Sequence, residues 1–370
     1  MNKRNIPFFN YESIFKENEK VYSDAMINAC KKGAYIMQEE LFEFENKLKK
    51  YLNVKHAIGV ADGTTALILS LRASGVGHGD EVLVPSHTFI ASVAAINHAG
   101  ANPVLVDCGK DHLIDENDLK HRITNKTKAI MPVQLNGRTV NMDKIVKIAE
   151  EYKLLIIEDS CQALGSKFKN KFAGTFGSAG TFSFYPSKTL GCFGDGGAII
   201  TNDDKIADMV ILFRDHGRGE DGKVWTYGYN ARLDNIQAAI LLEKLKFYDE
   251  FIQKRRSLAH LYNENLKNLS EIVLPPGPNE NHDHYDIYQN YEIEAENRDE
   301  LRTFLEKNGV KTILQWGGYM VHEFEKLGLN TDLPFTKKAS GKFMLLPMNT
   351  SLDEDDIEYI CKLINDFYKN

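Results

Sequence analysis

Short apolar segments alternate with helical segments over the first two thirds of the chain, and this alternation limits the fold more than any other feature. The apolar segments have the length of single strands and cover residues 56–60, 81–84, 103–107, 128–133, 154–157, 180–184 and 198–201. Apolar residues at helical spacing accompany them at 36–51, 66–72, 92–98 and 142–152. Fully apolar strands alternating with helices indicate a mainly parallel sheet covered by helices on both faces. We therefore expect an α/β protein.

The pattern changes after residue 245. A long, polar-rich helix is expected at 246–268 and could bridge two domains, and a strand-helix-strand unit follows at 291–294, 298–308 and 310–313. A polar loop at 279–284 precedes this unit, and a terminal helix is expected at 353–368. The chain has 370 residues, too many for one ordinary domain. We expect a large domain at 1–245 and a smaller C-terminal α/β domain at 246–370.

Composition excludes several classes of protein. With 43% hydrophobic and 26% charged residues the chain is an ordinary globular one, and a net charge of −7 argues against nucleic-acid binding. No apolar stretch has the length of a membrane span, and no apolar run follows the basic residues Lys3 and Arg4 as in a signal peptide. The five cysteines are scattered without a CxxC pair, which favours reduced thiols in the cytoplasm over a disulfide or zinc framework.

Two residues at the ends of apolar segments point to a cofactor. Asp159 ends the segment Ile156-Ile-Glu-Asp159, and Lys188 follows the aromatic run Thr181-Phe-Ser-Phe-Tyr-Pro-Ser-Lys188. A lysine that forms a Schiff base and a carboxylate that holds a pyridinium nitrogen are the groups that pyridoxal 5'-phosphate (PLP) requires. The spacing leaves room for one more strand and its connections, so both side chains could reach one cofactor from neighbouring strands.

Each of these residues also has a simpler interpretation. Asp159 could cap a helix that starts with Ser160-Cys-Gln162, and most lysines lie on the surface. The aromatic approach to Lys188 favours a desolvated, reactive amine instead.

Further residues could bind other parts of the cofactor. Gly63-Thr-Thr65 precedes an apolar helix and could cradle a phosphate, or it could simply cap that helix. The hydroxyl of Ser183 is a second candidate phosphate ligand, and Gln162 could reach a ring substituent. Phe89 could stack on a flat ring or be a core aromatic. The pair His282 and His284 reads as a solvated loop, so we expect no metal site.

The order of these motifs resembles the DegT/StrS family, which comprises PLP-dependent sugar aminotransferases of fold type I, the aspartate aminotransferase-like architecture. The resemblance covers the chain from about Gly33 to the C-terminus and rests on five segments found together: 63–65, 85–89, 159–162, 183–188 and 228–239.

The resemblance implies roles for the candidate residues. Lys188 would bind PLP covalently and act as the base of the proton shift, and Asp159 would pair with the pyridine nitrogen. Gln162 would contact the ring hydroxyl, and Phe89 would lie against the ring face. Gly63, Thr64 and Ser183 would hold the phosphate. Asn230 would reach the phosphate of the neighbouring subunit's cofactor, in a homodimer with shared active sites.

Two segments depart from the family pattern. Gln134 stands where many members carry a histidine, and Leu314-Gln-Trp-Gly-Gly-Tyr-Met-Val-His322 differs from a proline-rich loop common in the family. Both lie where sugar recognition is expected, so the substrate carries over less safely than the chemistry.

The expected reaction is transamination of a nucleotide-linked keto-deoxysugar, with the ketone at C4 or C3, for surface glycan or related amino-sugar biosynthesis. L-Glutamate would be the donor, 2-oxoglutarate its product and pyridoxamine phosphate the intermediate form of the cofactor. Three alternatives remain open: an aminotransferase for a cyclitol or other cyclic ketone, a PLP-dependent sugar dehydratase, and a cofactor-binding protein without catalysis. Dehydratases of this fold carry a histidine in place of the lysine, so Lys188 argues against the second.

Overall fold

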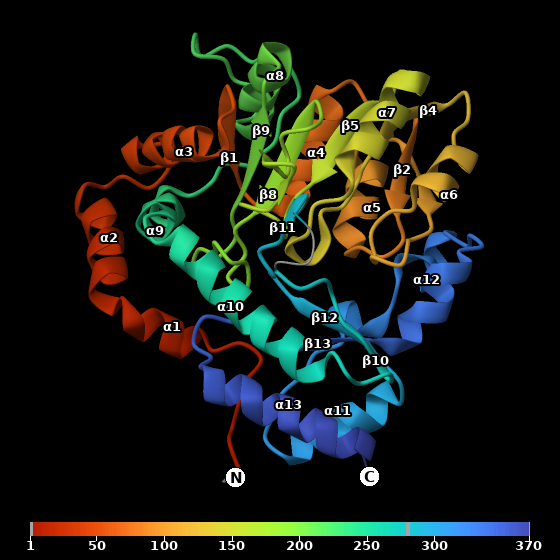
Figure 1. Cartoon of the computed structure of the whole chain (residues 1–370). Coiled ribbons are helices and arrows are strands. Elements are labelled where there is room, and N and C mark those ends of the chain that lie inside the picture. Colours follow the sequence, from red (N-terminus) through yellow and green to blue (C-terminus); the bar gives the residue numbers. More distant parts are fainter. Residues whose placement is uncertain (1–2, 279–281, 370) are drawn as a thin grey trace.

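The computed structural model describes residues 3–278 and 282–369, so residues 279–281 of the expected polar loop lie outside the described part. Its centre is a seven-stranded sheet in the order β1-β9-β8-β5-β4-β2-β3 (Figure 1). In that order the strands are β1 (His56–Val60), β9 (Gly197–Thr201), β8 (Ala179–Ser183), β5 (Leu155–Asp159), β4 (Thr127–Ile130), β2 (Glu81–Pro85) and β3 (Asn102–Val106). The five strands from β8 to β3 run parallel, and β9 pairs antiparallel with both β8 and β1, so β9 alone runs opposite to the other strands of this sheet. The prediction of a mainly parallel sheet is confirmed.

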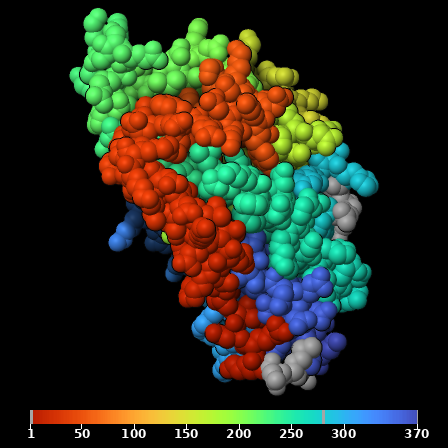
Figure 2. All heavy atoms as spheres, turned by 90° about the vertical axis from the view of Figure 1, so that its left-hand side faces the viewer, coloured from red at the N-terminus to blue at the C-terminus, as the bar shows by residue number. Residues whose placement is uncertain are grey.

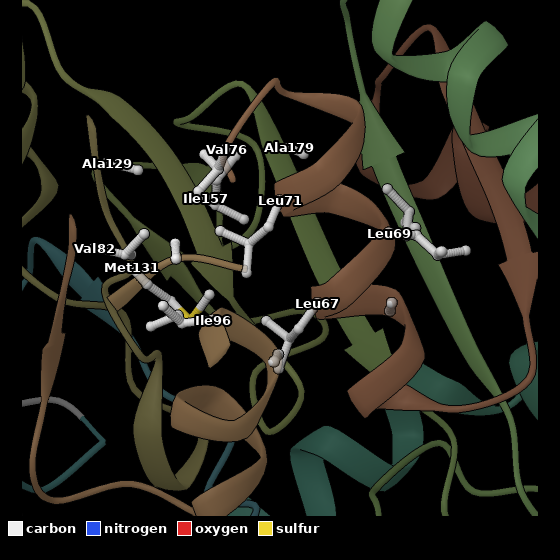
Figure 3. Packing of buried hydrophobic residues seen from close by; sticks show 14 of the residues in the cluster. Leu67, Leu69, Leu71, Val76, Val82, Ile96, Ala129, Met131, Ile157 and Ala179 are labelled. Carbon is white, nitrogen blue, oxygen red and sulfur yellow. The ribbon is translucent and has the colours of Figure 1, made fainter. Parts of the chain in front are cut away.

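Helices cover both faces of this sheet because its strands are apolar on both faces. The covering helices are α3 (Glu39–Leu52), α4 (Gly63–Ala73), α5 (Ile90–His98), α7 (Met142–Tyr152), α8 (Asp204–Arg214) and α9 (Asn235–Leu245). Neighbouring residues of β5 show the alternation: Ile157 packs with α4 and α5, whereas Ile156 packs with α7. Leu67, Leu69 and Leu71 of α4 lie in the same core as Ile157 (Figure 3).

The C-terminal part is built on a second sheet. Its strands pair antiparallel in the order β10 (Ile272–Val273), β12 (Tyr291–Ala295) and β13 (Phe343–Leu346). Helices α11 (Arg298–Lys307) and α13 (Glu354–Lys369) pack on this part of the structure. The predicted strand at 310–313 is wrong, because only its end residues pair: Val310 with Ile6 and Ile313 with Leu345. The strand that completes the sheet is β13, an apolar run that the sequence analysis missed.

Two segments connect the halves of the molecule. Helix α10 (Tyr248–Leu266) contributes Ile252 to a core shared with the large sheet and Tyr262 to the core of the C-terminal part. The N-terminal segment begins beside the C-terminal sheet and continues through α1 (Tyr11–Glu17) and α2 (Glu19–Lys31), which contacts α9. Figure 2 shows this segment, in red, along one side of the molecule. The domain boundary at residue 245 stays a prediction.

The remaining elements are short. They are α6 (Glu116–His121), α12 (Pro334–Ala339), β6 (Lys167–Phe168), β7 (Lys171–Phe172), β11 (His284–Tyr285), η1 (Leu135–Gly137), η2 (Gln315–Gly318), η3 (Val321–Glu323), η4 (Glu325–Leu327) and η5 (Ser340–Lys342). The turn η2 falls within the segment that departs from the family pattern. None of the described helices has the length and apolar character that a bilayer span requires.

Candidate active site

A cavity of about 580 Å³ opens at the carboxyl ends of the parallel strands. Its position follows from the sheet, since β5 ends at Asp159 and its parallel neighbour β8 ends at Ser183. Seven of the eight residues predicted from the sequence line this cavity: Gly63, Thr64, Phe89, Asp159, Gln162, Ser183 and Lys188. The eighth, Asn230, is exposed elsewhere, where its Oδ1 accepts a hydrogen bond from Arg232 at 2.6 Å.

Lys188 sits in the turn that follows β8. Its backbone N–H donates to the carbonyl of Tyr185 at 2.8 Å, which closes the turn and directs the side chain to the cavity wall. Burial lowers the pKa of its ammonium group, and the nearby groups of Cys161 and Asp159 oppose that effect only in part. A lowered pKa increases the fraction of neutral amine, which is the nucleophilic form. Lys188 lines the cavity and is only partly exposed, so the surface interpretation is wrong.

Asp159 is fixed as a hydrogen-bond acceptor. Its Oδ2 accepts from the hydroxyl of Ser92 at 2.6 Å, and its Oδ1 accepts from the backbone N–H of Cys161 at 3.2 Å. The chain forms a turn after Asp159 and no helix begins there, so the helix-cap interpretation is also wrong. The carboxylate instead faces the same cavity as Lys188.

The first turn of α4, where a cradle was predicted, lines the cavity with Gly63 and Thr64. The N-cap Asp62 accepts from the backbone N–H and the hydroxyl of Thr65, at 2.8 and 2.7 Å. The N–H groups of Gly63 and Thr64 belong to the first turn, where no carbonyl within the helix can accept them. A Cβ on Gly63 would lie 2.9 Å from the Cβ and 3.3 Å from the Oγ of Ser183, so the serine hydroxyl lies directly against the helix start.

Phe89 and the segment around Trp316 form an aromatic wall. Phe89 is 50% exposed at the N-cap of α5, which excludes the core interpretation. Its ring centroid lies 6.4 Å from that of Trp316, at an interplanar angle of 34°. Trp316 lies in η2 with a φ of 53°, in the left-handed region that places its ring against the cavity.

Amide side chains form a polar wall of the cavity. Gln162 Oε1 accepts from the backbone N–H of Asn136 at 2.8 Å, and Asn136 Oδ1 accepts from Asn290 at 2.8 Å and from Gln315 at 3.0 Å. Of these, Asn290 and Gln315 line the cavity with Gln162. The sequence analysis missed Asn290, Gln315 and Gln289 as individual residues, because no local motif marks them.

Gln134 does not line the cavity. It is fully buried, where its amide donates to Glu158 at 2.7 Å and accepts from the backbone N–H of Val140 at 2.6 Å. Glu158 in turn accepts from three backbone N–H groups of the loop after β7. Gln134 therefore has a structural role beside β5, the strand that ends at Asp159.

The charges around the cavity are unbalanced. Lys188 is the single cationic side chain among the described residues that line it, whereas Asp62, Asp159 and Asp195 are acidic. No group of three or more described His, Cys, Asp or Glu side chains could hold a metal ion.

Known proteins resemble this chain over nearly its whole length. It is 36% identical over 365 residues to a pleiotropic regulatory protein from Geobacillus stearothermophilus, covering 97% of this chain and 96% of that protein. It is 36% identical over 370 residues to GDP-perosamine synthase from Escherichia coli O157:H7, covering 97% of this chain and 98% of that protein. The crystal structure of S. venezuelae DesV in complex with a ketimine intermediate matches with a TM-score of 0.95 at 33% identity, covering 99% of both chains. A model of the DegT/DnrJ/EryC1/StrS aminotransferase family matches residues 16–365, and the chain belongs to this family.

Proposed function

We propose that the chain is a PLP-dependent aminotransferase that converts a nucleotide-linked keto sugar to the amino sugar. The observation that carries the proposal is the cavity shared by Lys188 and Asp159. One supplies an amine whose pKa burial lowers, and the other supplies a carboxylate held by two donors. PLP enzymes need these two groups, for covalent attachment and for a protonated ring nitrogen.

The residues around the cavity fit PLP. The N–H groups of Gly63 and Thr64 with the hydroxyl of Ser183 would hold the phosphate, because a helix N-terminus favours an anion. Ser183 lies so close to Gly63 that a Cβ at this position would clash with it, and this close approach supports the cradle. Gln162 would contact the ring hydroxyl, and Phe89 would lie against the ring face. When bound, PLP supplies an electron sink for the carbanion that forms at the substrate carbon.

Lys188 would have two roles in the reaction, as covalent anchor and as base. Its Nζ first holds the cofactor and is then released when the amino donor takes its place. The free amine would accept the proton that the α-carbon of the donor loses and pass it to the cofactor carbon, and in the second half it would move a proton from that carbon to the sugar carbon that receives nitrogen. The carboxylate of Asp159 would pair with the ring nitrogen and favour the protonated form of that nitrogen.

The substrate proposal rests on relatives and on the cavity wall. The relative from E. coli is named GDP-perosamine synthase, and DesV was captured with a ketimine intermediate. Amides such as Gln315 and Asn290 can both donate to and accept from sugar hydroxyls, and they belong to the wall of this cavity. We propose L-glutamate as the donor, a ketone at C4 or C3, and a cytoplasmic role in surface glycan or related amino-sugar biosynthesis.

We further propose a homodimer with shared active sites. The phosphate of PLP, the carboxylates of glutamate and the diphosphate of a nucleotide sugar are all anions, but Lys188 is the single cationic side chain that this chain contributes to the described lining. The segment that ends at Asn230 carries two strongly exposed aromatic residues, Trp225 at 65% and Tyr227 at 93%. It projects beside α8 (Figure 1), and a second copy would bring Asn230 to the phosphate.

An absorption spectrum before and after addition of L-glutamate tests the proposal. We expect a band near ~420 nm from cofactor bound to Lys188, and its conversion to a band near ~330 nm as the amino group is transferred. Keto-sugar nucleotides are then screened for return of the first band. A chain that forms no band with added PLP contradicts the assignment of Lys188.

The same experiment separates the alternatives. The relative from G. stearothermophilus is named a pleiotropic regulatory protein, and a regulator without catalysis would bind PLP but leave the band unchanged by glutamate. A cyclitol aminotransferase would complete the glutamate half-reaction and then respond to cyclic ketones instead of nucleotide sugars. A dehydratase would need a different base, because Lys188 occupies the position of its histidine.

A further inference from the structure

The loop that carries Lys188 lies between two hollows. The active-site cavity borders it on one side, at Ser187 and Lys188. On the other side a second cavity of about 390 Å³ is lined by the loop from Pro186 to Thr189. Neighbouring side chains therefore pack against only part of this loop. Hydrogen bonds then contribute more to the position of Lys188.

Gln289 makes those hydrogen bonds on both sides of Lys188. Its Nε2 donates to the carbonyl of Ser187 at 2.8 Å, and its Oε1 accepts from the backbone N–H of Thr189 at 2.7 Å and from the hydroxyl of Thr189 at 2.9 Å. The donor and the acceptor of one amide thus hold the residue before and the residue after the lysine. Leucine, which has a similar size, could make none of these bonds.

The backbone of Gln289 is itself held firmly. Arg255 is buried and donates to the carbonyls of Tyr288 and Gln289 at 3.0 and 3.1 Å, and to that of Met348 at 3.0 Å. On the opposite side Gly137 approaches so closely that a Cβ there would lie 2.7 Å from the backbone nitrogen of Gln289. The amide is therefore presented to the lysine loop from a fixed point.

We infer that Gln289 is a positioning residue that fixes the Lys188 loop so that Nζ reaches the cofactor carbonyl and the substrate carbon. Proton transfer and nucleophilic attack require reacting atoms within about 3–3.5 Å, and a small displacement of the lysine slows both steps. The inference rests on the proposed function, because it assigns Lys188 the covalent and proton-transfer roles. Gln289 itself touches neither reacting atom in this assignment.

The test compares two forms of the cofactor in the variant Gln289→Leu. Pyridoxamine phosphate has the ring and phosphate of PLP but no carbonyl for Lys188 to attack, so its dissociation constant measures the pocket without the lysine. We expect that constant to stay within about twofold of the wild-type value. Covalent band formation by apoprotein mixed with PLP should be about tenfold slower, the scale of losing one or two hydrogen bonds.

Two further variants sharpen the comparison. Thr189→Val removes only the hydroxyl bond and keeps the backbone bond, so its effect on band formation should have the same direction and be smaller. Gln253→Leu removes an exposed amide that donates to Tyr285 at 2.6 Å, outside both cavities, and should leave the rate unchanged. Thermal unfolding of each apoprotein checks that the variants fold.

Two results would overturn the inference. One is a wild-type rate of band formation in Gln289→Leu. The other is an equal weakening of pyridoxamine phosphate binding, which would show that Gln289 supports the whole pocket and not the lysine. A wild-type chain that forms no band with PLP contradicts the proposed function itself, whatever the variants do.

Discussion

The hydroxyl of Ser92 donates a hydrogen bond to Oδ2 of Asp159 at 2.6 Å, and both side chains are buried. Ser92 lies in α5 and Asp159 ends β5, so a helix packed on the sheet fixes the carboxylate that is to face the cofactor ring. The Ser92 oxygen lies 2.7 Å from the hydroxyl of Thr88, which completes a short chain of hydroxyl groups. Ser92 therefore supports the carboxylate at one oxygen, and the backbone of Cys161 supports it at the other.

Removing the hydrogen bond from Ser92 should slow the reaction less than removing the charge of Asp159. Ser92→Ala leaves the charge of Asp159 but deletes one donor to it, and we expect about a tenfold lower rate of the glutamate half-reaction. Asp159→Asn deletes the charge that keeps the ring nitrogen protonated, and should lower the same rate by at least about a hundredfold. Stopped-flow absorption at both bands measures the rates. Equal rates in Asp159→Asn and wild type would contradict the role of the carboxylate.

Asp159, Ser183 and Lys188 could be predicted because they follow the ends of apolar strands, and parallel strands place their carboxyl ends at one edge. Gln289 could not be predicted in the same way. It follows no periodic segment, and only the return of the chain from α10 brings it to the lysine loop. Trp316 lay in a segment expected at the site, but its approach to the cavity depends on a left-handed turn that the sequence did not mark.

The wrong prediction of a strand at 310–313, in place of β13, has a similar origin. Val310-Lys-Thr-Ile313 has the β-branched residues that favour a strand, whereas Phe343–Leu346 is a short apolar run that suits a buried helix or a buried strand equally well. Pairing decides between them. β12 bonds to the second segment along its length, and the first segment reaches partners only at its two ends.

Covalent attachment should be specific to Lys188. Another lysine, Lys244, lies buried in the neighbouring cavity, and burial lowers its pKa to about 8. Borohydride reduction of the PLP complex, followed by peptide mass analysis, should place the label on Lys188 in the wild type and in Lys244→Arg. Lys188→Arg should bind PLP without a label and lose turnover, because a guanidinium group stays protonated. A label on Lys244, or more than trace turnover in Lys188→Arg, would sink the assignment.

The cradle at Gly63 should not tolerate a side chain. In Gly63→Ala the new Cβ would lie 2.9 Å from the Cβ of Ser183 and 3.0 Å from the Sγ of Cys161, so the serine must move away from the phosphate. We expect the dissociation constant for pyridoxamine phosphate to rise about tenfold or more. Gly77→Ala is the matched control, because the nearest atom to its Cβ is 3.8 Å away. Titration followed by absorption compares the two, and equal affinities would argue against the cradle.

Substitution of Gln315 should affect the half-reaction with the keto sugar and not the half-reaction with glutamate. Gln315 lines the cavity from the C-terminal part, and its side chain bonds to Asn136 on the polar wall that we assign to the sugar. Gln315→Leu should raise the KM for the keto-sugar nucleotide by about tenfold, the loss of one or two hydrogen bonds, and leave the glutamate half-reaction unchanged. A slower glutamate half-reaction with an unchanged KM for the sugar would place Gln315 on the donor side instead.

A buried charge cluster joins the large sheet to the C-terminal sheet and should make stability depend on pH. Glu292 of β12 lies 3.3 Å from both His87 and His112, and His112 also bonds to Glu294 at 2.8 Å. Burial opposes the charge of Glu292, but the two histidines outweigh it and lower its pKa to about 2. Burial likewise opposes the charge of His112, but Glu292 and Glu294 outweigh it and raise its pKa to about 9.

The sign of the effect follows from these two shifts. A lowered carboxyl pKa gives stability that is present above its unfolded value of ~4.3 and is lost as the pH falls toward 2. A raised histidine pKa gives stability that is present below ~6.5 and is lost as the pH rises through 9. The pair Glu292 and His112 should therefore contribute most between about pH 4.5 and 6.5.

Glu292→Gln tests this dependence directly. The variant should lose about 3 kcal/mol of unfolding free energy near pH 6, the scale of breaking a buried ion pair, and the difference from wild type should shrink toward pH 9 as His112 loses its proton. Urea unfolding followed by circular dichroism, at several pH values, measures the difference. Glu264→Gln removes an exposed pair with Lys267 and should change stability little at any pH. A loss in Glu292→Gln that is the same at pH 6 and pH 9 would mean that Glu292 acts through packing, without the charge of His112.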